Sequence, residues 1–422
     1  MKEILNFLIE VNKLKEMPRT GLLWLGVKNP STVAEHTFQA TLAVWLLGEK
    51  RNINLERTFK AILSHDLCEV YGGDATPFWG LLPKKEAERK KFLKKWIRIP
   101  LKEKEERRKK RFEAEKTCLF KLINPLRPEL KKEIFSSWIN YERGVSPEGR
   151  FCKQVDQIAG MIEALETLGI KKRGWVTPWW EESEELIDDS LLQKFLKTIQ
   201  KKFYNQKPKN YKRDKDLEST LDFILEIGKL KKMSRLYWIM RKVNVPETVA
   251  GHIFTLTIIA WVFGKEKKFK MEKLFKMALA HELSAAYTGD TTPYDKILPA
   301  NRKDRHQILQ KMVRLPQREK KKIFLKDYRE EKKALEKLTR KLRPALRKEI
   351  IQLWNEYRTR SSPEGCFLSQ LNVAAVLLQG LLYEKRDKNF SAAPLWEWAF
   401  EVSDDPKILK LLEEMKNKFY PD

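Results

Sequence analysis

The sequence contains little cysteine. Its 422 residues include four cysteines, and no two of them have the paired spacing of a structural metal site. They fall inside apolar helical patterns, at Cys68, Cys118, Cys152 and Cys366. This usage excludes a small disulfide-bonded secreted domain and is typical of buried thiols in a reducing compartment. We therefore expect the protein to be cytoplasmic.

Long hydrophobic runs are also missing. The longest apolar stretches span residues 256–263 and 373–378, whereas a helix needs about 20 apolar residues to cross a bilayer. Residues 1–16 have the pattern of an amphipathic helix without a cleavage site. From these features we expect a soluble protein that is not exported and has no membrane partner.

Histidine is scarce, and its positions reveal a duplication. Of five histidines, four form the pairs His36 with His252 and His65 with His281, each 216 positions apart. The same offset relates further landmarks: Arg19 with Arg235, Asp74 with Asp290, and residues 202–204 with 418–420. An offset that holds from near the first residue to near the last indicates two equivalent folds with hardly an insertion between them.

The duplication sets the expected domain organisation. We expect a first domain at residues 1–206, a linker at 207–216 and a second domain at 217–422. The linker region is polar and charged and has no apolar period. In both copies apolar residues recur with the period of a helix, and strand-like alternation is nearly absent. The sequence therefore predicts an all-α fold with two tandem helical bundles.

Local signals place individual helices. Thr32 and Glu35 have the spacing of a capping box, which predicts a helix that begins near residue 32. A third helix is expected over residues 59–72, before Gly73, because glycine allows the left-handed turn at a helix end. Further helices are expected over residues 130–141, 148–168 and 190–204. The apolar face of the first helix is formed by Ile4, Leu5, Leu8, Val11 and Leu14.

Residue types that bind metal ions gather in the first copy. His65 and Asp66 are consecutive on an otherwise apolar helix, where an unpaired aspartate would be costly to bury. Both can reach one ion that lies close to the helix surface, and His36 and Asp156 are available as further ligands from other helices. Two imidazoles and two carboxylates suit Mn, Co, Mg, Fe or Zn and leave positions open for water and substrate. We therefore predict one divalent metal ion.

Other polar residues of the first copy are candidates for binding and proton transfer. Glu69 follows His65 by one helical turn, and Asp74 lies in the loop after the glycine pair, where a carboxylate can steer a water or a leaving group. Arg19 offers a planar fork that matches phosphate oxygens. With Trp24 and Thr76 it forms the expected substrate-binding set.

The order of these residues resembles that of the HD-domain metal-dependent phosphohydrolases. The similarity is greatest to the bacterial 5′-deoxynucleotidases and their eukaryotic HD-containing relatives, and it rests on the motifs AEHTF, LSHDLCEVYGGDATP and SPEGRFCKQVDQ. It covers nearly all of residues 1–206 and, more weakly, 217–422. The resemblance implies a single divalent ion held by His36, His65, Asp66 and Asp156, and phosphate removal from deoxyribonucleoside 5′-monophosphates.

The resemblance also implies roles for other residues. Glu69 and Asp74 match the family's acid–base carboxylate and its water- or leaving-group-orienting carboxylate, and Arg19 matches its phosphate-binding arginine. Relatives place an aromatic residue soon after this arginine, whereas Leu22 stands there and Trp24 comes two positions later. The base and sugar preference therefore stays open. A dinuclear site would need further histidines, and the Gly-Tyr-Pro signature of cyclic-dinucleotide hydrolases is absent.

The second copy has lost some of these residue types. Its site consists of Arg235, His252, His281, Glu282, Asp290 and Asn372, so that Glu282 replaces Asp66 and Asn372 replaces Asp156. Ala285 stands where the first copy has Glu69. A neutral amide and a longer carboxylate should weaken metal binding sharply. We expect a degenerate, non-catalytic half that replaces the second subunit of an ancestral dimer and forms an intramolecular pseudo-dimer.

The positive charge is concentrated in two segments. The chain carries a formal net charge of +27, and residues 84–116 contain 16 basic and 7 acidic residues. A related segment spans residues 301–333. Such segments indicate either a solvated helical face or a surface for nucleic acid or another polyanion. The favoured function is a nucleotide phosphomonoesterase, and the alternative is a regulatory nucleotide- or nucleic-acid-binding protein with little catalysis.

Overall fold

A computed structural model describes residues 1–76, 80–94, 99–169, 173–205, 208–292, 294, 298–299, 301–309, 311 and 313–421. All residues of the two expected sites lie within these ranges. Residue 207 of the expected linker lies outside them, as do residues 95–98, 310 and 312 of the basic segments.

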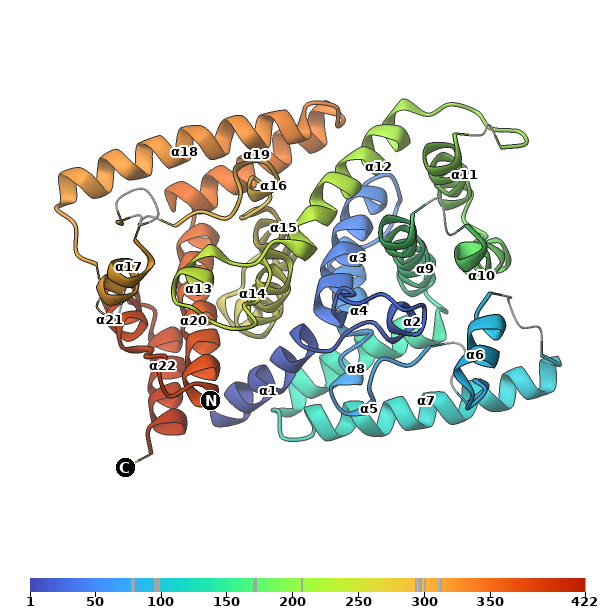
Figure 1. The fold of residues 1–422 in the computed structure, drawn as a ribbon, viewed down its shortest axis with the longest axis horizontal. Helices are drawn as coiled ribbons and strands as arrows, with labels where there is room; N and C mark the ends of the chain where they lie inside the picture. The colour runs from blue at the N-terminus through green and yellow to red at the C-terminus, as the bar shows by residue number, and fades with distance from the viewer. Residues whose placement is uncertain are drawn as a thin grey trace. The chain divides into compact units, whose positions relative to one another are not determined.

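The described residues form helices without a β-strand, which confirms the all-α prediction (Figure 1). Two isolated bridges, Pro18 with Thr32 and Ser234 with Thr248, are themselves related by 216 positions. The first copy contains α1 Lys2–Asn12, η1 Lys13–Lys15, α2 Thr20–Trp24, α3 Val33–Gly48, α4 Leu55–Ser64, α5 Glu69–Gly72, α6 Glu86–Phe92, α7 Leu101–Ile123, α8 Pro128–Arg143, α9 Pro147–Leu168, α10 Arg173–Leu186 and α11 Ser190–Tyr204.

The second copy repeats this order of helices. Trp45 and Trp138, fully buried in the first copy, have counterparts in Trp261 and Trp354, which are buried equally well. The elements are α12 Lys215–Gly228, η3 Lys229–Lys232, α13 Leu236–Met240, α14 Val249–Gly264, η4 Lys265–Lys267, α15 Met271–Ala280, α16 Ala285–Thr288, α17 Arg302–Leu309, α18 Gln317–Thr339, α19 Pro344–Thr359, α20 Pro363–Arg386, α21 Ala393–Val402 and α22 Pro406–Phe419.

The helix start at residue 32 is confirmed. The Thr32 hydroxyl accepts a hydrogen bond from the backbone N–H of Glu35 at 3.3 Å, and the Glu35 carboxylate accepts one from the backbone N–H of Thr32 at 2.7 Å. The helix it caps, α3, is buried along its whole length. This cap therefore fixes the point from which His36 enters the core.

The predicted helix over residues 59–72 is interrupted. α4 ends at Ser64, and a turn leads through His65 and Asp66 to α5, which starts at Glu69. In this turn the backbone N–H of Glu69 donates to the carbonyl of Asp66, three residues earlier, at 3.1 Å. The tighter hydrogen bonding ends the regular helix, so periodicity alone did not reveal the break. The helix ends before Gly73 as expected, because Gly73 has a φ of +74°, in the left-handed region that glycine allows.

The chain forms two compact units whose bounds differ from the expected 1–206 and 217–422. The N-terminal unit comprises residues 10–225, and the C-terminal unit comprises residues 1–9 together with 226–422. Most of α1 thus belongs to the unit that contains the second copy, and most of α12 to the unit that contains the first. Equivalent helices carry similar apolar faces, such as Leu5 and Leu221, so the sequence could not decide which helix completes which unit.

One helix of the described residues, α20, is long and apolar enough to cross a membrane by length and composition alone. About 78% of its most apolar stretch is buried inside the protein. Core helices meet the same criterion, so this is weak evidence for a span. The uninterrupted apolar run within this helix is still residues 373–378, because Gln370 and Asn372 precede it without ending the helix.

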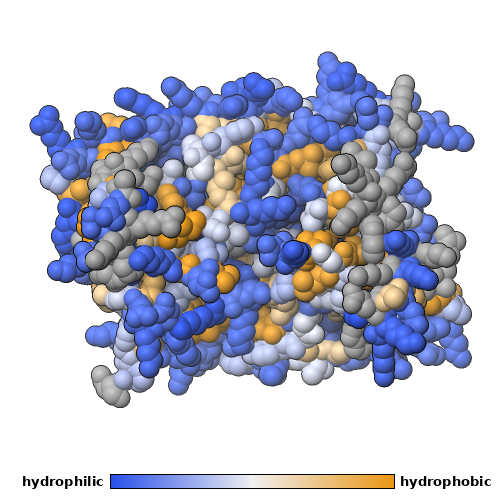
Figure 2. Space-filling model, viewed as in Figure 1, coloured by the Kyte–Doolittle hydropathy of each residue, from blue (hydrophilic) through white to orange (hydrophobic). Residues whose placement is uncertain are grey.

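The surface and the thiols complete the description of the fold. On the face that Figure 2 shows, hydrophilic side chains cover most of the surface, with hydrophobic patches between them. All four cysteines are free thiols. Cys68 and Cys152 are buried as expected, whereas Cys118 is half-buried and Cys366 is exposed, because the helical faces that carry these two residues are not fully covered.

Candidate metal centre

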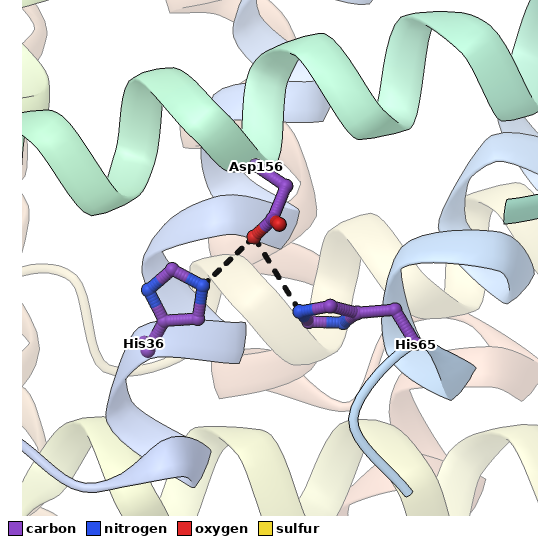
Figure 3. Close-up of side chains that lie close together, drawn as sticks. All are labelled: His36, His65 and Asp156. Atoms are coloured by element: carbon purple, nitrogen blue, oxygen red, sulfur yellow. Dashed lines mark hydrogen bonds and ion pairs between the residues drawn. The ribbon is translucent and has the colours of Figure 1, made fainter. Parts of the chain in front are cut away.

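Three predicted ligands come together in the N-terminal unit (Figure 3). His36 projects from α3, His65 from the turn after α4 and Asp156 from α9. Asp156 Oδ1 lies 2.8 Å from His36 Nε2 and 3.4 Å from His65 Nε2. One potential ligand atom from each residue lies within 4.8 Å of the other two. This arrangement is suited to a single ion.

Asp66 lies beside this group. Its Oδ2 atom is 2.9 Å from His65 Nε2, and both atoms are buried without a hydrogen-bond partner. Buried polar atoms are nearly always paired, so two unsatisfied ligand atoms facing each other fit a site built for a cation. The four predicted ligands therefore lie in one place.

The ligands are oriented by groups behind them. His65 Nδ1 lies 2.6 Å from the carbonyl oxygen of Ile62, which places the proton on Nδ1 and leaves the Nε2 lone pair for an ion. Tyr141 donates a hydrogen bond of 2.7 Å to Asp156 Oδ2. Glu163 places Oε2 3.4 Å from His36 Nδ1. Sequence analysis missed Tyr141 and Glu163. The signal for Glu163 was its place seven residues after Asp156, on the same face of an apolar helix.

Arg19 lies among carboxylates. Its Nη1 is 2.9 Å from Asp74 Oδ1 and 3.5 Å from Asp66 Oδ2, and its Nε is 3.8 Å from Glu163 Oε2. Burial by itself would lower the pKa of Arg19, but the three carboxylates outweigh it and raise the pKa. Asp74 also accepts a hydrogen bond from the backbone N–H of Thr20. Arg19 is therefore fixed with its guanidinium next to the metal ligands.

Glu69 is a buried carboxyl group without a hydrogen bond to its Oε2 atom. Burial and the neighbouring charges of Asp66 and Asp74 raise the pKa of Glu69 well above its usual value. A carboxyl group held in its neutral form can donate a proton, as a general acid must.

Two cavities meet at Arg19. The larger cavity has a volume of about 480 Å³. Three of the four predicted metal ligands, His65, Asp66 and Asp156, line it together with Glu69 and Tyr141. The smaller, of about 100 Å³, is lined by Asp74, Thr76 and Leu22 among others. Trp179 of α10 lines both cavities, whereas Trp24 lines neither. The structure therefore brings Arg19 and Thr76 to the site and offers Trp179 as its aromatic wall.

Part of the first basic segment faces the larger cavity. This cavity is lined by five cationic side chains from α7, the end of α8 and the start of α9: Arg108, Arg111, Arg143, Arg150 and Lys153. The interpretation of the segment as a solvated helical face is therefore incomplete. Most of α7 is exposed, but two of its arginines belong to the site.

The second copy keeps the distance between the first histidine and its partner, but the partner is a neutral amide in place of a carboxylate. His252 Nε2 lies 2.8 Å from Asn372 Oδ1, the same distance as between His36 and Asp156. Glu282 turns to Arg235, with Oε1 3.0 Å from Nη1, and Asp290 lies at 3.0 Å from the same nitrogen. Burial lowers the pKa of His281, whereas the carboxylates around His65 raise its pKa against burial.

The carboxylate near Nδ1 of the equivalent histidines His36 and His252 comes from a different sequence position in each copy. In the first copy Ser31 donates a hydrogen bond to Glu163, and in the second Glu247 and Gln379 occupy the equivalent positions. Glu247 Oε1 lies 3.9 Å from His252 Nδ1 and accepts a hydrogen bond of 2.9 Å from Trp238 Nε1. Each histidine thus has a carboxylate near Nδ1, supplied by a different helix or loop.

Comparison with known proteins agrees with the duplication. The HD domain matches this chain twice, over residues 11–183 and 227–395. The 5′-deoxynucleotidase HDDC2 of Homo sapiens is 29% identical over 199 residues, which are 47% of this chain and 85% of that protein. The 5′-deoxynucleotidase YBR242W of Saccharomyces cerevisiae is 29% identical over 163 residues, which are 39% of this chain and 59% of that protein.

A solved structure was also found. The PH0347 protein of Pyrococcus horikoshii OT3 has a TM-score of 0.34 and 24% sequence identity, and the match covers 47% of this chain and 97% of that one. The two HD-domain matches together span more than half of the sequence. The chain therefore belongs to the HD-domain family, and it contains the domain twice.

Proposed function

We propose that this chain is a metal-dependent phosphomonoesterase that hydrolyses nucleoside or deoxyribonucleoside 5′-monophosphates in its N-terminal unit. The observation that carries the proposal is the group of His36, His65 and Asp156, with Asp66 beside it and Arg19 within 3.5 Å of Asp66. The relatives named 5′-deoxynucleotidases support the nucleotide substrate.

The chemistry divides between the ion and the protein. His36, His65, Asp66 and Asp156 would hold a divalent ion, which would act as a Lewis acid and lower the pKa of water. Arg19 neutralises the phosphate oxygens with its planar fork. Glu69, whose pKa is raised by burial, donates a proton to the leaving oxygen, and Asp74 holds Arg19 in place through its 2.9 Å contact.

The C-terminal unit is the non-catalytic part of this proposal. Asn372 and Glu282 stand at two ligand positions and Ala285 at that of the acid, so that a bound ion and a proton donor are both disfavoured there. We propose that this half acts as the pseudo-dimer partner of the first. The cytoplasmic location expected from the free thiols is part of the same proposal.

The competing function is regulatory binding of nucleotides or nucleic acid with little catalysis, and the lost ligands of the second copy favour it. A phosphate-release assay with a panel of 5′-nucleotides and added Mn²⁺, Co²⁺, Mg²⁺, Fe²⁺ or Zn²⁺ separates the two. We expect turnover with at least one metal and complete loss of turnover with a chelator. Binding of nucleotides without phosphate release under any of these conditions contradicts the phosphomonoesterase.

A further inference from the structure

The larger cavity holds more cationic side chains than one phosphate requires. Arg19 already lies beside the metal ligands, and five more cations line the same cavity. Four carboxylates besides those at the metal site, Glu115, Glu142, Glu182 and Asp188, line it too. Lys153 and Arg150 precede Asp156 on α9 by three and six residues, which places them about 5 and 9 Å from it along the helix axis. These two cations therefore lie progressively farther from Asp156 towards the start of α9.

Two of the five cations form no ion pair with the described part of the chain. Arg111 Nε lies 2.5 Å from Glu115 Oε1, Arg150 pairs with Asp188, and Lys153 donates to the carbonyl of Glu142 at 2.8 Å. Arg108 and Arg143 are exposed, and neither forms an ion pair with any residue that the structure describes. Both guanidinium groups are thus available to an anion in the cavity.

The second copy serves as an internal control for these cations. Its equivalent positions hold Phe324, Asp327, Thr359, Cys366 and Ser369, and none of these is basic. Its basic segment as a whole is retained, because residues 301–333 contain 13 basic and 5 acidic residues. Solubility would preserve the total charge without regard to position. The cavity cations are instead absent from the copy that also lacks Asp66 and Asp156, although it keeps both histidines, which indicates that they serve the same site.

The second copy gains two cations at equivalent cavity positions, Arg358 and Arg360, where the first copy has Glu142 and Gly144, and the first of them is already paired. Arg358 stands where the first copy has Glu142, and it forms two hydrogen bonds of 2.7 Å to Glu331 through Nε and Nη2. Its guanidinium also lies 5.2 Å from the ring of Phe324. Arg358 is therefore held by its own unit.

The cations of the first copy repel one another. Burial lowers the pKa of Lys153, and the nearby charges of Arg108 and Arg111 lower it further, against the effect of Glu142. An anion bound in the cavity would be attracted by these positive charges.

We infer that this cavity takes nucleotides that carry a second phosphate in addition to the 5′-phosphate, and that Arg108 and Arg143 bind that second phosphate. The inference rests on the proposed function for the choice of a nucleotide. The second phosphate is either the 3′-phosphate of a nucleoside bisphosphate or the next phosphate of a 5′-phosphorylated oligonucleotide. In both cases a planar guanidinium matches the phosphate oxygens.

The test compares three substrates of the full-length protein: thymidine 5′-monophosphate, thymidine 3′,5′-bisphosphate and 5′-phosphorylated dithymidylate. We expect kcat/KM for at least one of the last two to exceed that for the monophosphate by about tenfold or more, the size of one or two charge-assisted hydrogen bonds. In the double variant Arg108→Gln/Arg143→Gln this ratio should fall to about one. A preference for both larger substrates identifies the backbone phosphate, and a preference for the bisphosphate alone identifies a free 3′-phosphate.

The matched control is Lys109→Gln/Lys110→Gln, which removes the same charge from exposed positions of α7 that do not line the cavity. It should leave the ratio unchanged. A ratio near one in the unmodified protein, or an equal fall in the control, overturns the inference while hydrolysis of the monophosphate still supports the proposed function. If no substrate is hydrolysed, the proposed function fails. The inference is then tested by calorimetry: the bisphosphate should bind at least about tenfold more tightly than the monophosphate, and equal affinities overturn the inference.

Discussion

In both copies a histidine places Nε2 2.8 Å from a side-chain oxygen, but the partner is the carboxylate of Asp156 in the first copy and the amide of Asn372 in the second. The packing that brings the two groups together is the same. Between Asp156 and Asn372, only the charge that attracts a cation differs. Helix packing thus holds residues in position whichever polar group they carry, and the chemistry of the site can be lost without loss of the fold.

The strongest way to break this comparison is to remove the first copy's ligands. Asp66→Ala or His36→Ala should abolish both bound metal and turnover, because each removes one of four expected ligands. Elemental analysis and phosphate release measure the two effects. His281→Ala is the matched control. It should lower turnover only as far as it lowers the fraction of folded protein. Stoichiometric metal in Asp66→Ala would show that the ligand assignment is wrong.

Separating the copies tests whether each depends on the other. Residues 1–206 lack residues 215–225, which belong to the N-terminal unit, so this fragment leaves apolar surface exposed. We expect it to aggregate or to form a homodimer that restores activity, as light scattering and phosphate release can show. The fragment 217–422 should be inactive at any metal concentration. A monodisperse, fully active monomer of 1–206 contradicts the pseudo-dimer.

Glu69 sharpens the comparison because its counterpart is Ala285. Glu69→Ala should retain the metal and lower the rate by about 10²–10⁴, the usual contribution of a general acid. Metal content and kcat measured on the same sample separate the two properties. Ala285→Glu in the second copy is the control and should produce no new activity. Loss of the metal in Glu69→Ala would instead make Glu69 a ligand.

Replacing Glu163, the carboxylate near His36 Nδ1, should have a smaller effect than these substitutions. Glu163→Gln installs the residue of the second copy and removes the charge near His36 Nδ1. We expect metal affinity to fall by about 10–100-fold, as is typical when a group that orients a ligand is lost. Competition with a chelator measures the affinity, and Gln379→Glu is the control without expected effect. Unchanged affinity would leave Glu163 with a packing role alone.

The smallest effect concerns pH and Glu182, whose counterpart is Trp398. Burial raises the pKa of Glu182 from 4.5 to about 7. The folded state therefore favours the neutral carboxyl, and the free energy of unfolding falls as pH rises from 4.5 towards 7. Glu182→Gln should have a higher Tm than the unmodified protein at about pH 8 and nearly the same Tm at about pH 4. An equal difference at both pH values excludes titration of this group as the cause.

Much of the fold could be predicted because its signals are local. The capping box at Thr32, the apolar face of α1 and the helices α8, α9 and α11 follow from short-range spacing, and the structure confirms them. Of the expected site, the four ligand types were recognisable because His and Asp are conspicuous on apolar helices. The break at His65 was not, because it depends on hydrogen bonds within a single turn.

The sequence by itself determined that the chain is a duplication, that both copies are helical, and that one copy has lost ligand charge, because a constant offset and helical periods are properties of residue order. Tertiary structure alone decided that residues 1–9 belong with the second copy. It also decided that Glu163 faces His36 and that Arg108 lines the cavity. These contacts join segments far apart in the chain, and which segments meet is set by how helices with similar apolar faces pack.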